Sequence, residues 1–229
     1  MTQHYLYLLQ AKADHGTDYR RWWLEEMGPQ IAASPDCLAL SVNIAVDPPG
    51  SGQPYRPETR VGDDYDLTLD LQCPDSDAHA RLLDIAGPQL ALQSRAVHGY
   101  RVTTSVEKNE IERLCGNPAP GYKLVRGFFA HADMPSSAFR RSWDNHVELA
   151  LKIHGFARYV RYFIDGAVTP GAPEIQGATN LHFASADDVL ERYFLGNDGE
   201  FLIAHDIRHF IDRGLARVFT REHILKSAS

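Results

Sequence analysis

The sequence predicts an α+β protein built from two tandem units, each with the element order β-α-β-β-α-β. An apolar segment ending in Ala-Asp occurs at residues 8–14 and again at 128–133. Each is followed by a helix-like segment with an Arg-Arg-x-Trp motif, and the two motifs, at Arg20 and Arg140, are 120 residues apart. Loops rich in Pro and Gly then begin at Asp47 and Asp165. This repeated order is the ferredoxin-like arrangement.

The remaining elements follow in parallel in the two halves. Their β-branched and aromatic content predicts strands, and their helical periodicity predicts helices. We expect the second strand at 37–46 and 156–164, the third at 65–71 and 178–183, the second helix at 75–93 and, interrupted, at 186–212, and a last strand beginning Arg-Val at 101 and 217.

A linker predicts where the two units meet. Charged residues give way to Cys-Gly-Asn-Pro-Ala-Pro-Gly between Glu107 and Gly121, so the predicted domains are 1–110 and 121–229. A four-stranded sheet with both helices on one face needs cover on its other face. We therefore expect the two sheets to pack face to face as an internal pseudo-dimer.

Composition excludes several classes of protein. The chain of 229 residues is 44% hydrophobic and 23% charged, which is typical of a globular protein, and its net charge of -7 without a basic stripe argues against a nucleic-acid partner. Its apolar runs are far shorter than the roughly 20 residues that span a bilayer. With no secretory signal at residues 1–10, we expect a cytoplasmic protein that does not enter a membrane.

Cofactor and metal motifs are also missing from the sequence. The three cysteines are widely spaced and odd in number, which favours reduced thiols over disulfides or a zinc site. No glycine pattern of a phosphate loop or dinucleotide-binding turn occurs. We predict no cofactor and no metal.

The second half carries the leading catalytic candidate, a histidine on the inward face of a helix. Phe139, Trp143, Val147 and Ala150 recur at helical spacing after residues 135–137, and His146 lies on their face. A histidine between an aromatic helix and a sheet could titrate near neutrality and transfer protons. It could equally be a buried histidine that only packs and hydrogen bonds.

Two further segments give weaker candidates. Glu26 occupies the position of His146 in the first half, where it either moves protons, if burial raises its pKa, or lies on a solvated helix turn. His205 and His209 have the i, i+4 spacing of two metal ligands, but the sequence supplies no third. In that segment Asp206 could orient a histidine or accept a hydrogen bond from a substrate hydroxyl, with Phe210 facing the core.

Strand alternation predicts which polar side chains of the second half lie on the same face of a strand. Asn180 and His182 fall on one side of their strand, opposite Leu181, and could line a wet cavity. In the preceding strand Tyr159 falls on the side opposite Arg158 and Tyr162. The Tyr159 hydroxyl could donate to a substrate carbonyl, or the ring could simply pack.

The second half resembles the EthD family of the dimeric α/β-barrel superfamily. The resemblance covers about 110 residues and rests on four parts in the family's order. These are Phe139-x-x-x-Trp143-x-x-His146, the Arg- and Tyr-rich segment 156–163, Leu181-x-Phe183-x-Ser185, and Leu202-x-x-x-Asp206-x-x-x-Phe210-x-Asp212. The first half looks like a diverged copy with Glu26 in place of the histidine, which puts a second active site in doubt.

The resemblance implies a tandem, intrachain dimeric α/β-barrel that binds a small molecule. It implies a cofactor-independent lyase or isomerase, of dehydratase or cyclase type, acting on a hydrophobic aromatic or polyketide-like compound. His146 would be the acid or base, with Asp206 and Tyr159 as helpers. Trp143, Asn180, His182, Phe210 and Glu26 would contact the substrate.

Two other classes and two assembly states stay open. The protein could be a non-catalytic small-molecule-binding accessory protein, or an oxygenase using haem or a metal, since the superfamily includes haem-handling members. A single chain with its internal pseudo-dimer and a homodimer of such chains are both compatible with the repeat.

Overall fold

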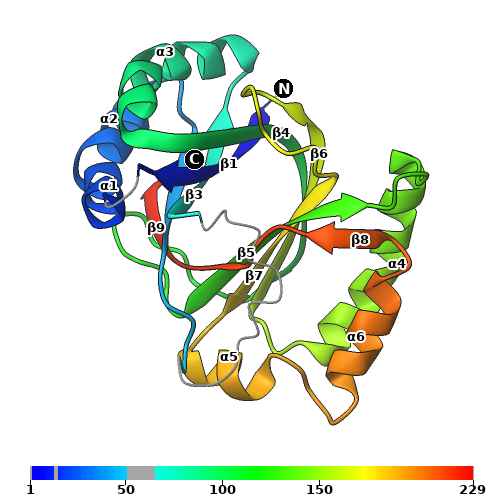
Figure 1. Ribbon diagram of the computed structural model, residues 1–229. Coiled ribbons are helices and arrows are strands. Elements are labelled where there is room, and N and C mark those ends of the chain that lie inside the picture. The colour runs from blue at the N-terminus through cyan, green and yellow to red at the C-terminus, as the bar shows by residue number, and fades with distance from the viewer. Residues whose placement is uncertain (1, 13–14, 51–64, 229) are drawn as a thin grey trace.

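The computed structural model describes residues 2–12, 15–50 and 65–228, so most of the first Pro/Gly-rich loop lies outside the described residues. Elements of both predicted halves follow the expected order (Figure 1). In the first half they are β1 (Gln3–Ala11), α1 (Gly16–Trp22), η1 (Trp23–Met27), α2 (Gly28–Ala33), β2 (Ala39–Ala45), β3 (Leu67–Cys73), α3 (Ser76–Gln93) and β4 (Ser94–Asn109). In the second they are β5 (Tyr122–Ala130), α4 (Ser136–Ile153), β6 (Arg158–Ala167), β7 (Gly177–Phe183), α5 (Ala186–Arg192), α6 (Gly199–Ile207), β8 (Ile211–Gly214) and β9 (Val218–Lys226).

The strands form one closed antiparallel barrel. The first half has the strand order β4-β1-β3-β2 and the second the matching order β9-β5-β7-β6. Hydrogen-bonded pairs β2–β9 and β4–β6 join the halves, so all eight of these strands have two neighbours. The predicted α+β fold is confirmed, with one refinement. The two sheets face each other across the barrel interior and are also joined edge to edge.

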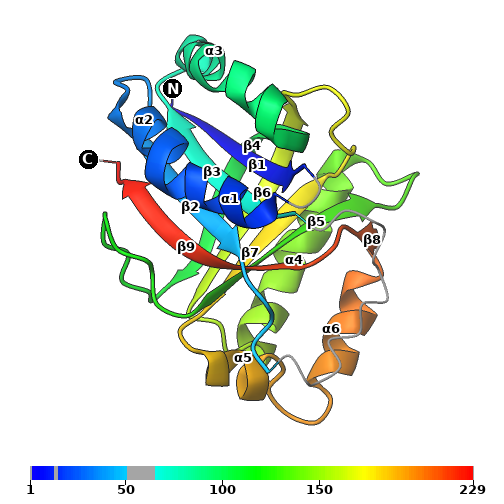
Figure 2. The same ribbon diagram turned by 60° about the vertical axis from the view of Figure 1, so that its left-hand side comes forward.

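Helices cover the outside of the barrel in two groups. α1, α2 and α3 lie over the first half, and α4 and α6 lie over the second, as Figures 1 and 2 show. The predicted inward face of α4 is buried, including Phe139, Trp143, His146 and Ala150. Each half thus has its own helix-to-sheet layer outside the shared barrel interior.

Two predicted elements differ from the structure in their bounds. β4 begins at Ser94, seven residues before the expected Arg101, because β1 pairs with it back to that residue. The helix expected over 186–212 has the predicted interruption, with Gly196 at a φ of +76° between α5 and α6. Its last residues form β8, which pairs with β5 beyond the end of β9. Among the described residues, no helix is long and apolar enough to cross a membrane.

The barrel interior has an apolar part and a polar part. The apolar part includes Leu6, Leu8, Val125 and Ala178. The polar part contains buried charged and amide groups and lies where the 110–121 linker runs along β9, with Pro118 bridged to His223. We call this polar part the lumen cluster, and we define it by Ser41, Asn43, Asp70, Arg113, Lys123, Arg158, Tyr162, Asn180, His182 and Glu222.

Candidate functional site

His146 and Asp206 form a hydrogen-bonded pair between two helices. His146 projects from α4 and is buried, and its Nδ1 lies 2.6 Å from Oδ2 of Asp206 on α6. Burial lowers the pKa of His146, and the Asp206 carboxylate opposes that shift. The ring is therefore neutral at pH 7, and its Nδ1–H donates to Asp206. Nε2 then carries a lone pair, and it has no hydrogen-bond partner among the described side chains and backbone.

His146 borders a cavity of about 80 Å³ between the outer face of the second sheet and helices α4 and α6. The polar groups that line it are His146, Arg126, His154, Tyr159, Thr179 and Arg217. Its aromatic lining consists of Phe128, Trp143, Tyr193, Phe194 and Phe210. Few polar groups converging on an apolar, aromatic hollow are typical of small-molecule sites.

Trp143 and Tyr159 form the floor of this cavity. The Trp143 Nε1–H donates to the Tyr159 hydroxyl over 3.1 Å, and both rings are buried. Burial raises the pKa of Tyr159, so its hydroxyl stays protonated and can donate a hydrogen bond. Gly177 on β7 makes room for the indole, because a Cβ there would lie 2.3 Å from Trp143 Cζ3.

The structure brings together five of the predicted site residues. His146, Trp143, Tyr159 and Phe210 all line the cavity, and Asp206 reaches it through His146. The Phe210 ring lies 5.7 Å from the His146 ring, which fixes one side of the imidazole. The predicted inward position of His146 is thus found beside a cavity.

Three predicted substrate contacts lie elsewhere, which corrects their grouping with His146. Thr179 and Leu181 of β7 line the cavity, so alternation turns Asn180 and His182 to the opposite face, inside the barrel. His182 Nε2 lies 2.7 Å from the carbonyl oxygen of Pro120, which belongs to the linker. Glu26 is exposed on η1, because that turn presents Trp23 and Met27 to the core instead.

Sequence reasoning missed three cationic or titratable residues of the cavity. Arg126 shares the outward face of β5 with Leu124 and Phe128, a period-two pattern that the sequence contains. His154 follows α4, and its Nδ1–H donates to the backbone carbonyl of Tyr193. Burial lowers the pKa of His154 to about 4. Arg217 directly precedes β9, where the sequence predicted the start of a strand but not a cavity residue.

No metal site is found in the part of the chain that the structure describes. No group of three or more His, Cys, Asp and Glu side chains there is arranged to hold an ion. The His205 and His209 rings lie 5.3 Å apart at the exposed end of α6, without a third ligand.

Comparisons with known proteins identify the fold. No protein-family model and no curated protein matches the sequence. An anthrone oxidase-like protein superposes with a TM-score of 0.66 and 11% identity, covering 100% of this chain and 95% of that one. A candidate monooxygenase from Fusobacterium nucleatum gives 0.60 and 10%, over 98% and 93% of the two chains.

A third solved structure extends the same fold to another activity. Chlorite dismutase from Candidatus Nitrospira defluvii superposes with a TM-score of 0.53 and 12% identity, over 98% of this chain and 92% of that one. The chain has the dimeric α/β-barrel fold. At these identities the likeness concerns the fold alone, and dimeric α/β-barrels support unrelated reactions. The finer EthD assignment of the second half stays a prediction.

Proposed function

We propose that this dimeric α/β-barrel is a small-molecule enzyme in which His146 removes a proton from an apolar, aromatic or polyketide-like compound. The observation that carries this proposal is the 2.6 Å contact of His146 Nδ1 with Asp206, with Nε2 left for a ligand in an aromatic cavity. A neutral imidazole at pH 7 is a competent base, and the carboxylate stabilises the imidazolium that forms.

The other polar groups of the cavity suit the charge that this step creates. Removing a proton next to a carbonyl, or from a phenol, places negative charge on an oxygen. The Tyr159 hydroxyl and the guanidinium groups of Arg126 and Arg217 line the same cavity and can stabilise that oxygen. Trp143 and Phe128 provide an apolar surface for the carbon skeleton.

The fate of the resulting carbanion separates two candidate functions. Returning the proton at another atom, or expelling a leaving group, gives the lyase or isomerase that the sequence predicts. Transfer of electrons to O₂ gives an oxygenase, which fits the neighbours described as anthrone oxidase-like and as a candidate monooxygenase. Anthrone plus O₂ gives anthraquinone plus water, so that reaction balances without another reductant. Both outcomes begin with the same proton removal.

A haem does not fit the residues as arranged here. The cavity of about 80 Å³ is well below the roughly 300–1,000 Å³ of cofactor and ligand pockets. The Phe210 ring lies 5.7 Å from the imidazole that would have to bind the iron.

The small cavity also constrains how a substrate enters. We infer that α6 moves outward to admit a ring system, since it carries Ile203, Ile207 and the Asp206 partner over the cavity. Gly196 and Gly199 flank the connection that would bend. A planar substrate needs a smaller displacement than a haem.

Hydrogen exchange tests the proposed step before any product is known. Anthrone serves as the probe, in deuterated buffer at pH 7 under argon, with proton NMR following its acidic methylene signal. We expect the protein to accelerate loss of that signal, and His146→Gln to abolish the acceleration. Equal rates for the two proteins would refute the role of His146. Arg101→Gln, an exposed change on β4, is the control.

Admitting O₂ then separates the candidates. Faster anthraquinone formation with matching O₂ uptake supports the oxygenase, whereas exchange without oxidation supports the lyase or isomerase class. A ligand-induced rise in melting temperature with neither exchange nor oxidation supports the accessory binding protein.

We also propose that residues 1–110 and 121–229 are duplicated domains, the second EthD-like, in a cytoplasmic monomer. The matching strand orders support the duplication. Closure of the barrel within one chain supports the monomer, because it leaves no barrel edge for a second copy to pair with.

A further inference from the structure

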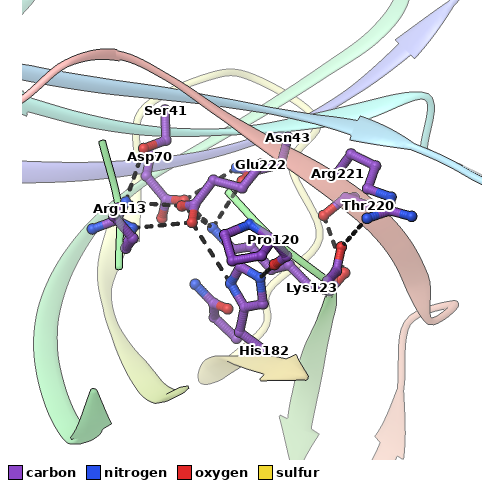
Figure 3. Close-up of polar contacts among 12 residues, drawn as sticks. Ser41, Asn43, Asp70, Arg113, Pro120, Lys123, His182, Thr220, Arg221 and Glu222 are labelled. Carbon is purple, nitrogen blue, oxygen red and sulfur yellow. Dashed lines mark hydrogen bonds and ion pairs between the residues drawn. The ribbon is translucent and has the colours of Figure 1, made fainter. Parts of the chain in front are cut away.

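The lumen cluster holds a chain of buried ion pairs inside the barrel. Lys123 Nζ lies 2.6 Å from Asp70 Oδ2 and 3.2 Å from Glu222 Oε1, and Lys123 and Glu222 are almost fully buried. Arg113, from the linker, binds both carboxylate oxygens of Glu222 at 2.8 and 3.0 Å (Figure 3). These contacts account for two carboxylates and two of the cluster's cations.

A third cation in the cluster has no counter-ion. Arg158 is 9% exposed, and its Nε has no hydrogen-bond acceptor. With the Asn180 amide oriented so that its oxygen faces the cations, Nη1 donates to that oxygen over 3.1 Å. No carboxylate lies within ion-pair distance of Arg158 in the described ranges 2–12, 15–50 and 65–228.

The other titratable groups near Arg158 do not balance its charge. The ammonium of Lys123 lowers the pKa of Asp70 and Glu222, and Arg113 and the more distant Arg158 also lower that of Glu222, so both carboxylates are ionised and already paired with Lys123 and Arg113. Burial lowers the pKa of His182 to about 4, so it is neutral at pH 7, and the Tyr162 hydroxyl stays protonated and donates a hydrogen bond to Asp70. Among its described members, the lumen cluster therefore carries three positive and two negative charges. An unpaired buried charge is costly in free energy.

A cavity of about 350 Å³ lies beside this charge, at the polar end of the barrel. Arg158, Arg113, Lys226, Ser41 and Thr104 contribute donors to its wall, and the Asp70 carboxylate, which is paired with Lys123, also lines it. Val102, Val106 and Val160 contribute an apolar strip, and Val106 is half exposed at its rim. This volume is separate from the His146 cavity, because alternation along β6 turns Arg158 inward and Tyr159 outward.

We propose that the polar end of the barrel binds a small organic monocarboxylate, with its carboxylate on Arg158 and its apolar body against the valines. One negative charge neutralises the excess and pairs with the guanidinium of Arg158, which lines the cavity. The apolar strip favours an acid with a hydrocarbon chain or ring over an inorganic anion. The site goes beyond the proposed function and does not depend on it.

Calorimetric titration of the full chain at constant ionic strength tests the proposal. The probes are acetate, hexanoate and benzoate, with hexanamide and benzamide as uncharged analogues and inorganic phosphate as the simple anion. We expect saturable binding of hexanoate and benzoate, weaker binding of acetate and none of the amides. Arg158→Gln should weaken hexanoate at least about tenfold, since a charge-assisted hydrogen bond is lost. Arg158→Lys should retain part of the affinity.

Two control variants test whether hexanoate binding takes place at Arg158. Arg101→Gln removes the same charge from the exposed face of β4 and should bind hexanoate like the wild type. His146→Gln should also leave this binding unchanged, because His146 borders the other cavity. Unchanged binding in Arg158→Gln, equal binding of the amides, or binding of phosphate alone would each overturn the proposal. If Arg158→Gln does not fold, full affinity in Arg158→Lys together with equal amide binding would do so.

Discussion

The two halves each bury a histidine against the outer face of their sheet, and the two imidazoles have different surroundings. His79 of α3 stacks on Tyr5 with ring centroids 3.6 Å apart, and the Tyr7 hydroxyl lies 2.6 Å from its Nε2. His146 of α4 has a carboxylate on Nδ1 and a cavity beside the ring. Burial lowers the pKa of both. Burial alone therefore does not identify a catalytic base. His146 is distinguished by its Nε2, which has no hydrogen-bond partner among the described residues, and by the cavity beside its ring.

Substituting the two histidines in parallel gives the largest expected contrast. His146→Gln should lower the rate of anthrone exchange or oxidation by about 10² to 10⁴, the usual contribution of a general base. His79→Gln should leave that rate within about twofold, because a structural histidine contributes through packing. Initial rates at saturating probe, with circular dichroism to confirm folding, measure both. A rate loss in His79→Gln as large as that in His146→Gln would remove the distinction between the halves.

Asp206→Asn should give a smaller loss of activity and a shift along the pH axis. The Asp206 carboxylate raises the pKa of His146 against burial, so its neutral replacement lowers that pKa further. The rate should rise with pH as His146 deprotonates, and this limb should move to lower pH in Asp206→Asn. At pH 7 we expect about a tenfold loss, from poorer orientation of the ring and a weaker base. A merely structural Asp206 would change the rate without moving the limb.

The sequence predicted the fold better than it predicted the site, for physical reasons. The repeat order, the inward face of α4 and the opposition of Tyr159 to Arg158 all follow from local periodicity, and the structure has them. Closure of the barrel depends on which strand edges meet, and β2–β9 joins residues about 180 apart. No local pattern encodes such a contact.

The grouping of Asn180 and His182 with His146 was wrong because it depends on how β7 is oriented in the barrel. Alternation separated Asn180 and His182 from Leu181, but it did not say which side of β7 faces the helices. The sequence therefore predicts that Tyr159, Asn180 and His182 contact the same substrate. The structure instead places both side chains in the lumen cluster, Asn180 beside Arg158 and His182 beside Glu222, and no local sequence pattern singles out these charged partners.

The smallest expected effect is on the pH dependence of the free energy of unfolding, and it again compares His79 of the first half with His146 of the second. Burial lowers the pKa of His79 to about 4, from about 6.5 in the unfolded chain. Between these values the unfolded state binds a proton that the folded state does not, so the free energy of unfolding falls as pH decreases below about 6.5. One such histidine changes it by about 1.4 kcal/mol per pH unit. His79→Gln should remove that much of the slope between pH 6 and 5, as measured by urea unfolding.

His146→Gln should remove less of this slope, because Asp206 partly restores the pKa of His146. A slope unchanged in His79→Gln would show that this ring is protonated within the fold, and the contrast between the two histidines would then lie in geometry alone.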